Sequence, residues 1–185
     1  MQQQVDAIND AFNPHGFRFN LRRLTRTVDK GWYRARYYWP EDRNMRETLR
    51  QGDKSALNLY FHPAFPSRSM GKTAVHEIGH WLGLTHLFYD QEPFQAADGS
   101  YADQYPKICQ PGLYNLVLDV PACYLDEDLL GPDSCPYEEI DTCPDLPGKD
   151  PIHNYMHYTS DRCMTEFTKG QEVRMKQMYA YFRAT

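Results

Sequence analysis

The segment from His76 to His86 constrains this 185-residue chain more than any other feature of its sequence. It carries the pattern His-Glu-x-x-His-x-x-Gly-x-x-His, with His80 as the middle histidine and Gly83 as the glycine. Residues four apart lie on one face of an α-helix, so His76 and His80 can point their rings at one metal ion. Gly83 can adopt a positive φ, which ends the helix and lets the chain return with His86 as a third ligand. The spacing therefore predicts a three-histidine metal site.

Three nitrogen ligands and one open position are typical of catalytic zinc, whereas structural zinc sites have four protein ligands. Glu77 lies beside the first ligand and is not needed for coordination. It is placed to accept a proton from an attacking water whose acidity the metal raises. A histidine pair on a helix is, by itself, more often a surface or core feature. The added glycine and third histidine favour a metal site, and Zn²⁺ is the predicted cofactor.

A second motif lies downstream, at Asn154-Tyr155-Met156-His157-Tyr158. Zinc sites of this pattern are followed by a tight turn that places a methionine beneath the metal, and Met156 fits that position. The alternative for Met156 is ordinary core packing, which is the role of most methionines. The order of the two motifs along the chain favours the turn. We expect the next residue, His157, to be a structural or exposed histidine.

These motifs resemble those of the metzincin zinc endopeptidases, and more narrowly those of the pappalysin-type branch with its secreted fungal members. The resemblance covers most of the chain and rests chiefly on residues 73–84, 141–144, 150–156 and 163–171. It implies that His76, His80 and His86 bind zinc and that Glu77 is the general base. It also implies that Tyr158 helps to stabilise the transition state, with a packing role as the alternative.

The chain departs from this family before the zinc helix. Between Phe61 and His76 there are only residues 62–75, where family members have a much longer stretch. That stretch includes the edge strand along which an extended peptide lies, so substrate docking rather than metal binding is expected to change. His157 also replaces the acidic residue that is usual after the methionine. Residues 114–122 resemble a family segment without matching its ends, so Ca²⁺ is a second cofactor considered there.

Arg162 is the candidate specificity residue. It follows the methionine turn, on the segment that walls the pocket beyond the scissile bond in this fold. If its guanidinium group faces that pocket, basic substrate side chains are disfavoured there by like-charge repulsion. A solvated surface arginine is the alternative.

Charge and cysteine usage bear on partners and compartment. The net charge of −5 argues against a nucleic-acid partner, and no apolar run reaches membrane-spanning length. None of the five cysteines lies in a C-x-x-C pair, which favours disulfides in an oxidising compartment over a second zinc site. By resemblance, the disulfide candidates are Cys109, Cys135, Cys143 and Cys163, which leaves Cys123 free or joined to another chain. We expect a secreted, extracellular monomer that acts on proteins or peptides.

The N-terminus lacks the pattern of a signal peptide. A start at or near the mature domain explains this, and a cytosolic protein that never had a signal is the alternative. Hydrophobic periodicity predicts helices over roughly 3–12, 41–50 and 70–82, strands over 17–21 and 57–61, and a final helix capped by Thr168.

We therefore predict an α+β fold in one catalytic domain, residues 1–185. An upper lobe, about 1–83, holds a small sheet and helices above a zinc cleft. An irregular, disulfide-stapled lower lobe, about 84–185, ends in a helix. The leading hypothesis is a zinc endopeptidase. One alternative is an interaction protein that binds zinc but cleaves little because the edge strand is missing, and another is a truncated chain that does not fold properly.

Overall fold

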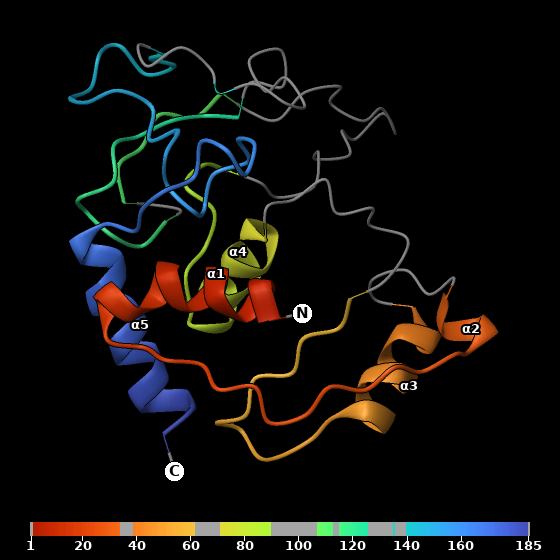
Figure 1. The fold of residues 1–185 in the computed structure, drawn as a ribbon. Helices are drawn as coiled ribbons and strands as arrows, with labels where there is room; N and C mark the ends of the chain where they lie inside the picture. Colours follow the sequence, from red (N-terminus) through yellow and green to blue (C-terminus); the bar gives the residue numbers. More distant parts are fainter. Residues whose placement is uncertain are drawn as a thin grey trace.

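The computed structural model describes residues 2–33, 39–61, 71–89, 107–112, 115–125, 135 and 140–184. The helices in these residues are α1 (Gln2–Phe12), the 3₁₀-helix η1 (Asn13–His15), α2 (Lys30–Tyr33), α3 (Pro40–Leu49), α4 (Lys72–Trp81) and α5 (Lys169–Phe182). Helices α1 and α4 contact each other at the centre of the molecule, α5 lies to one side, and α2 and α3 form a separate contacting pair (Figure 1).

The core lies where α1, α4 and the segment before α5 meet. The predicted apolar face of α4 is fully buried, with Val75, Ile78 and Leu82 each 0% exposed. From α1, Phe12 is also fully buried and its ring centroid lies 5.1 Å from that of Phe167. Burying such side chains contributes about 1.5–3 kcal/mol each, so this cluster fixes the helix that carries the histidine motif.

The ends of the helices follow local sequence signals. Thr168 caps α5 as predicted, because its side chain accepts from the Gln171 backbone N–H while the Gln171 side chain accepts from the Thr168 N–H. Asn13–Pro14 and Gly16, with a φ of 84°, end the first helical segment. The short helix α2 was not predicted. Asp29 starts it by accepting the N–H groups of Gly31 and Trp32, each at 2.8 Å.

The predicted strands are not formed. Residues 17–21 and 57–61 belong to no β-ladder in the part of the chain that the structure describes, where the recorded pairing is an isolated parallel bridge between Asn154 and Glu166. The alternation in 17–21 has another cause, since Phe17 and Phe19 pack against the core and Leu21 is 48% exposed. A strand also needs a neighbour for its backbone groups. Residues 62–70, in the stretch that is expected from the sequence to be shortened, lie outside the described residues.

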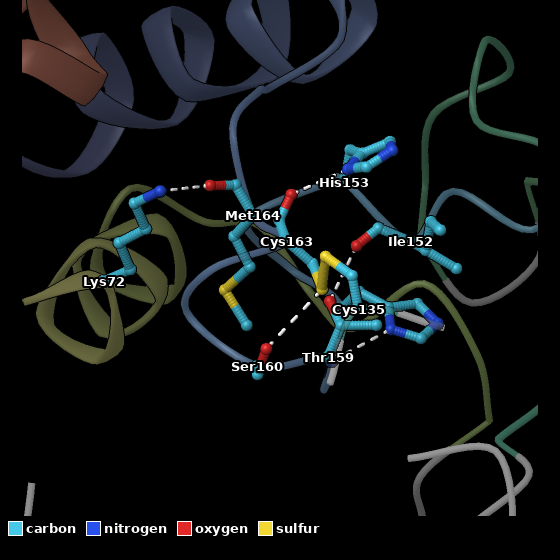
Figure 2. Close-up of a disulfide and its surroundings, with 9 residues drawn as sticks. Lys72, Cys135, Ile152, His153, Thr159, Ser160, Cys163 and Met164 are labelled. Carbon is cyan, nitrogen blue, oxygen red and sulfur yellow. Dashed lines mark hydrogen bonds between the residues drawn. A yellow bond between two sulfur atoms is a disulfide. The ribbon is translucent and has the colours of Figure 1, made fainter. Parts of the chain in front are cut away.

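The segment that follows α4 in the sequence is irregular and cross-linked. The described residues between 107 and 150 contain no helix or strand, in agreement with the prediction for this region. The structure joins Cys109 to Cys143 and Cys135 to Cys163, and leaves Cys123 as a buried free thiol. Figure 2 shows the second disulfide, with the Ser160 hydroxyl oxygen 3.5 Å from Cys163 Sγ. None of the described helices has both the length and the apolar composition needed to cross a lipid bilayer.

Candidate metal centre

Helix α4 ends in the turn that the glycine predicts. Gly83 has a φ of 88°, its N–H donates to the His80 carbonyl, and the Leu84 N–H donates to the Gly79 carbonyl, both at 2.9 Å. This pair of bonds is a Schellman motif, in which a left-handed glycine closes the helix. The turn reverses the chain and brings His86 back toward the helix.

The three histidine rings converge on one point. The Nε2 atoms of His76, His80 and His86 lie 3.0 Å from one another in all three pairs. In the part of the chain that the structure describes, these three side chains are close enough together to bind one metal ion. A zinc ion bound to imidazole nitrogens at about 2.0–2.1 Å can reach all three atoms from one position.

Hydrogen bonds on the far side of the rings explain why a cation fits. His76 Nδ1 lies 2.7 Å from the Tyr155 carbonyl oxygen, and His80 Nδ1 lies 2.9 Å from the Leu84 carbonyl oxygen. A carbonyl only accepts, so both rings carry their proton on Nδ1. Their Nε2 lone pairs therefore face each other, an arrangement that a shared cation stabilises. Such carbonyl partners are the usual means of fixing the tautomer and direction of a metal-binding histidine.

His76, the first candidate ligand, is neutral at ordinary pH. His76 is 7% exposed, and its burial, followed by the nearby His80 and His86, lowers its pKa from 6.5 to about 3. Protons therefore do not compete with a metal for His76 Nε2 near neutral pH.

Met156 packs against the motif helix at Gly79. It is fully buried, and a Cβ added at Gly79 would overlap its Sδ atom. The absence of a side chain at Gly79 thus lets the turn residue approach the helix between two of the histidines. The Met-turn role of Met156 stays a prediction, and this contact is compatible with it.

Glu77 follows His76 on α4, and Tyr158 contacts His86. The Glu77 side chain is exposed, as a group that must meet water and substrate should be. Tyr158 is 42% exposed, and its hydroxyl oxygen lies 3.3 Å from His86 Nδ1. The phenol thus lies at the edge of the site, where its ring also packs against the rings of His86 and Phe88 at centroid distances of 4.5 and 5.0 Å.

His157 and Arg162 are the two other residues considered from the sequence. His157 is 4% exposed, and its Nδ1 accepts from the Thr159 N–H at 3.2 Å, while burial lowers its pKa to about 4. It is a structural histidine, one of the two roles expected for it. Arg162 is exposed, and no contact in the described residues links it to the histidines.

Sequence reasoning missed three polar anchors of the site. Asp161 accepts the N–H of Lys72 at 2.7 Å and so caps α4 from 89 residues away, at a start where Gly71 supplies no side chain. Lys72 Nζ donates in turn to the Met164 carbonyl (Figure 2). Arg174 donates from Nε to the Gly83 carbonyl at 2.7 Å. Aspartate before a helix is a cap signal, but only when it is near in sequence.

Zinc suits this donor set, because neutral imidazoles with an open coordination position are its common catalytic ligands. The turn that presents Met156 beneath the triad places the chain in the metzincin class of zinc metalloproteases.

Comparison with curated proteins agrees with this class. The extracellular metalloprotease of Verticillium alfalfae is 34% identical over 220 residues, covering 99% of this chain and 70% of the relative. That of Pyricularia oryzae is also 34% identical, covering 100% and 68%. Extracellular metalloprotease 1 of Coccidioides posadasii is 32% identical, covering 100% and 70%. No family model matches the chain.

The chain belongs to this family of fungal extracellular metalloproteases, and the predicted resemblance and extracellular location are confirmed. The alignment with the Verticillium protein spans 220 positions although this chain has 185 residues, so the relative has residues in that span which this chain lacks. Among solved structures, mature Tannerella forsythia mirolysin in complex with a cleaved peptide is 32% identical. That match covers 59% of this chain and 33% of mirolysin, with a TM-score of 0.39.

Proposed function

We propose that this chain is a secreted zinc endopeptidase in which His76, His80 and His86 hold the metal and Glu77 is the general base. The observation that carries the proposal is the convergence of the three Nε2 atoms, each 3.0 Å from the other two. The membership in a family of extracellular metalloproteases supports the same reaction.

The roles of the residues follow from their positions. Zinc in this site would supply Lewis acidity, polarising the scissile carbonyl and lowering the pKa of the attacking water to about 7. Glu77 accepts the proton of that water and delivers it to the leaving nitrogen. Tyr158, exposed at the edge of the triad, donates its phenol hydrogen to the carbonyl oxygen as negative charge develops there. Met156 supports the triad from below through its contact at Gly79.

The substrates are proteins or peptides, bound by a monomer in a cleft between an upper lobe of about 1–83 and a lower lobe of about 84–185. Arg162 is exposed and lies in the segment after the Met-turn, where it disfavours basic substrate side chains by charge repulsion. A Ca²⁺ site in residues 114–122 stays a prediction without support. Both carboxylate oxygens of Asp119 already accept hydrogen bonds, from the Thr168 hydroxyl and the Gly170 N–H.

The alternative function is an interaction protein that binds zinc but cleaves little. It is favoured by the short span between Phe61 and the zinc helix and by the lack of a β-ladder in residues 17–21 and 57–61 of the described chain. An extended peptide needs an unpaired strand edge to dock in the usual way.

The test compares the wild-type chain with Glu77→Gln in the cleavage of casein or gelatin. A lost general base lowers the rate by roughly 10²- to 10⁴-fold. Glu47→Gln is the matched control, because Glu47 is an exposed glutamate on α3 paired only with Arg43 one turn away among the described contacts. It should cleave at the wild-type rate. Zinc content, measured by elemental analysis, should be one ion per chain in all three proteins.

The outcomes separate the three hypotheses. Stoichiometric zinc without cleavage by the wild-type chain would favour the interaction protein. Equal cleavage by the wild type and Glu77→Gln would end the proposed mechanism. A chain that holds no zinc would contradict both functions and favour the truncated chain.

A further inference from the structure

Two buried amide side chains pair with each other behind the Met-turn. Asn154 begins the turn and Gln171 lies in the first turn of α5, and each is 1% exposed. Asn154 Nδ2 donates to Gln171 Oε1 at 2.7 Å, and Gln171 Nε2 donates to Asn154 Oδ1 at 3.0 Å. A reciprocal pair of this kind in a dry interior stabilises one arrangement strongly, because any rotation leaves buried polar atoms unpaired.

Each amide oxygen of the pair also accepts a backbone N–H. Asn154 Oδ1 accepts from Met156 at 2.9 Å, and Gln171 Oε1 accepts from Thr168 at 2.8 Å. A flip of either amide would break three of these bonds at once. The pair therefore holds the backbone of the Met-turn against the first turn of α5.

The peptide held by Asn154 is the one that orients the first metal ligand. Tyr155 lies between Asn154 and Met156, and its carbonyl oxygen lies 2.7 Å from His76 Nδ1. The Met156 N–H, in the same peptide as this carbonyl, donates to Asn154 Oδ1, and the Tyr155 N–H in the preceding peptide donates to the Glu166 carbonyl at 2.9 Å. The direction of the Tyr155 carbonyl sets the direction of the His76 ring.

We propose that Asn154 and Gln171 are a positioning pair for zinc: they act through the Tyr155 carbonyl to hold His76 Nε2 toward the other two ligands. The inference rests on the zinc site of the proposed function and adds residues that touch neither metal nor substrate. Outer hydrogen-bond partners of metal ligands typically affect metal affinity by about 10- to 100-fold. Asn154 and Gln171 do not contact His76 directly but act through the Tyr155 carbonyl. We therefore expect their effect on zinc affinity to be near the lower end of that range.

The experiment measures zinc transfer from the loaded protein to an excess of a chromophoric chelator. In Gln171→Glu the ionised carboxylate still accepts from Asn154 Nδ2 and Thr168 N–H, but it offers no hydrogen to Asn154 Oδ1. We expect transfer about tenfold faster than in the wild type. Gln177→Glu, the same change at an exposed position of α5, should transfer zinc at the wild-type rate.

A pH series separates positioning from a loss of stability. As the pH falls, the introduced carboxyl group becomes protonated and can donate to Asn154 Oδ1 as the amide did. The ratio of the Gln171→Glu rate to the wild-type rate should therefore fall back toward one, whereas general destabilisation would make it grow. Methionine is similar in length to glutamine but forms no hydrogen bonds here, so Gln171→Met should release zinc faster than the wild type at every pH. This variant replaces Gln171→Glu in the experiment if Gln171→Glu does not fold.

Wild-type release rates in both Gln171 variants, with one zinc per chain, would overturn the inference and leave the proposed function intact. A ratio that grows as the pH falls would also overturn it. A wild-type chain without zinc would instead remove the proposed function on which the inference rests.

Discussion

Gly83→Ala adds one methyl group at the turn between the second and third histidines. Gly83 has a φ of 88°, in the left-handed region that non-glycine residues resist. That conformation costs roughly 1–2 kcal/mol for an L-residue with a Cβ. This first contribution to the loss of stability comes from the backbone alone.

A second contribution comes from α5. The added Cβ would lie 2.6 Å from Met178 Cγ and 2.8 Å from Met178 Cβ, whereas carbon atoms in contact prefer about 3.5–4.0 Å. Met178 Cβ is attached to the helix backbone and cannot rotate away, so α5 or the turn has to shift. Overpacking of this kind costs about 1–3 kcal/mol. We therefore expect Gly83→Ala to lower the free energy of unfolding by about 2–5 kcal/mol.

The assay is urea unfolding of the zinc-loaded protein at a fixed free-zinc concentration, because bound zinc itself adds stability. Gly16→Ala is the matched control. Gly16 has a φ of 84°, but its added Cβ would meet only Lys176 Cε at 3.5 Å and Nζ at 3.7 Å, which is ordinary contact. Gly16→Ala should therefore show the backbone cost alone, about 1–2 kcal/mol. Equal losses in the two variants would refute the placement of Met178 against the turn.

Three further predictions concern single side chains. Asp161→Ala removes the cap from the Lys72 N–H and should lower the free energy of unfolding by about 1 kcal/mol, measured in urea; an unchanged midpoint would contradict the cap. Hydrogen bonds from Lys176, Lys169 and His15 lower the pKa of Glu172 from 4.5 to about 2. Between these two pH values only the unfolded chain binds the proton, so the free energy of unfolding of the wild type should decline as the pH falls from 4.5 toward 2. Glu172→Gln should show a smaller decline in acid titrations followed by circular dichroism. Parallel titration curves of the wild type and Glu172→Gln would contradict this role of Glu172. Tyr158→Phe should lower kcat roughly 10²-fold with little change in KM, and an unchanged kcat would show a packing role.

The three-histidine motif could be predicted because all the residues that form it lie within eleven consecutive positions. Helical periodicity places His76 and His80 on one face, and one glycine returns His86. The cap of α5 was predictable for the same reason, since Thr168 and Gln171 are three residues apart. Where an interaction is local, the residue types and their spacing are nearly sufficient.

The anchors of the site were not predictable because they join distant segments. Asp161 caps a helix 89 residues earlier, and Asn154 pairs with Gln171 across a turn and a helix start. Asparagine, glutamine and aspartate are common surface residues, and no periodicity marks the few that become buried partners. These contacts exist only once the Met-turn, α4 and α5 have packed together.

The predicted strands failed for a related reason. Alternation of apolar and polar residues in 17–21 indicates that one side of the segment is buried, and Phe17 and Phe19 do pack against the core. The alternation does not indicate whether a second strand lies beside this segment. In the described residues no second strand pairs with this segment, so the local pattern remains without a ladder.

X-ray absorption at the zinc edge of the loaded protein is the most direct test of the central claim. The account predicts one zinc per chain, with three imidazole nitrogens at about 2.0–2.1 Å and one further light ligand that is lost or altered when an inhibitor with a zinc-binding group is added. His80→Ala should abolish this spectrum. A shell containing sulfur, a fourth imidazole, or a spectrum unchanged in His80→Ala would contradict the three-histidine site.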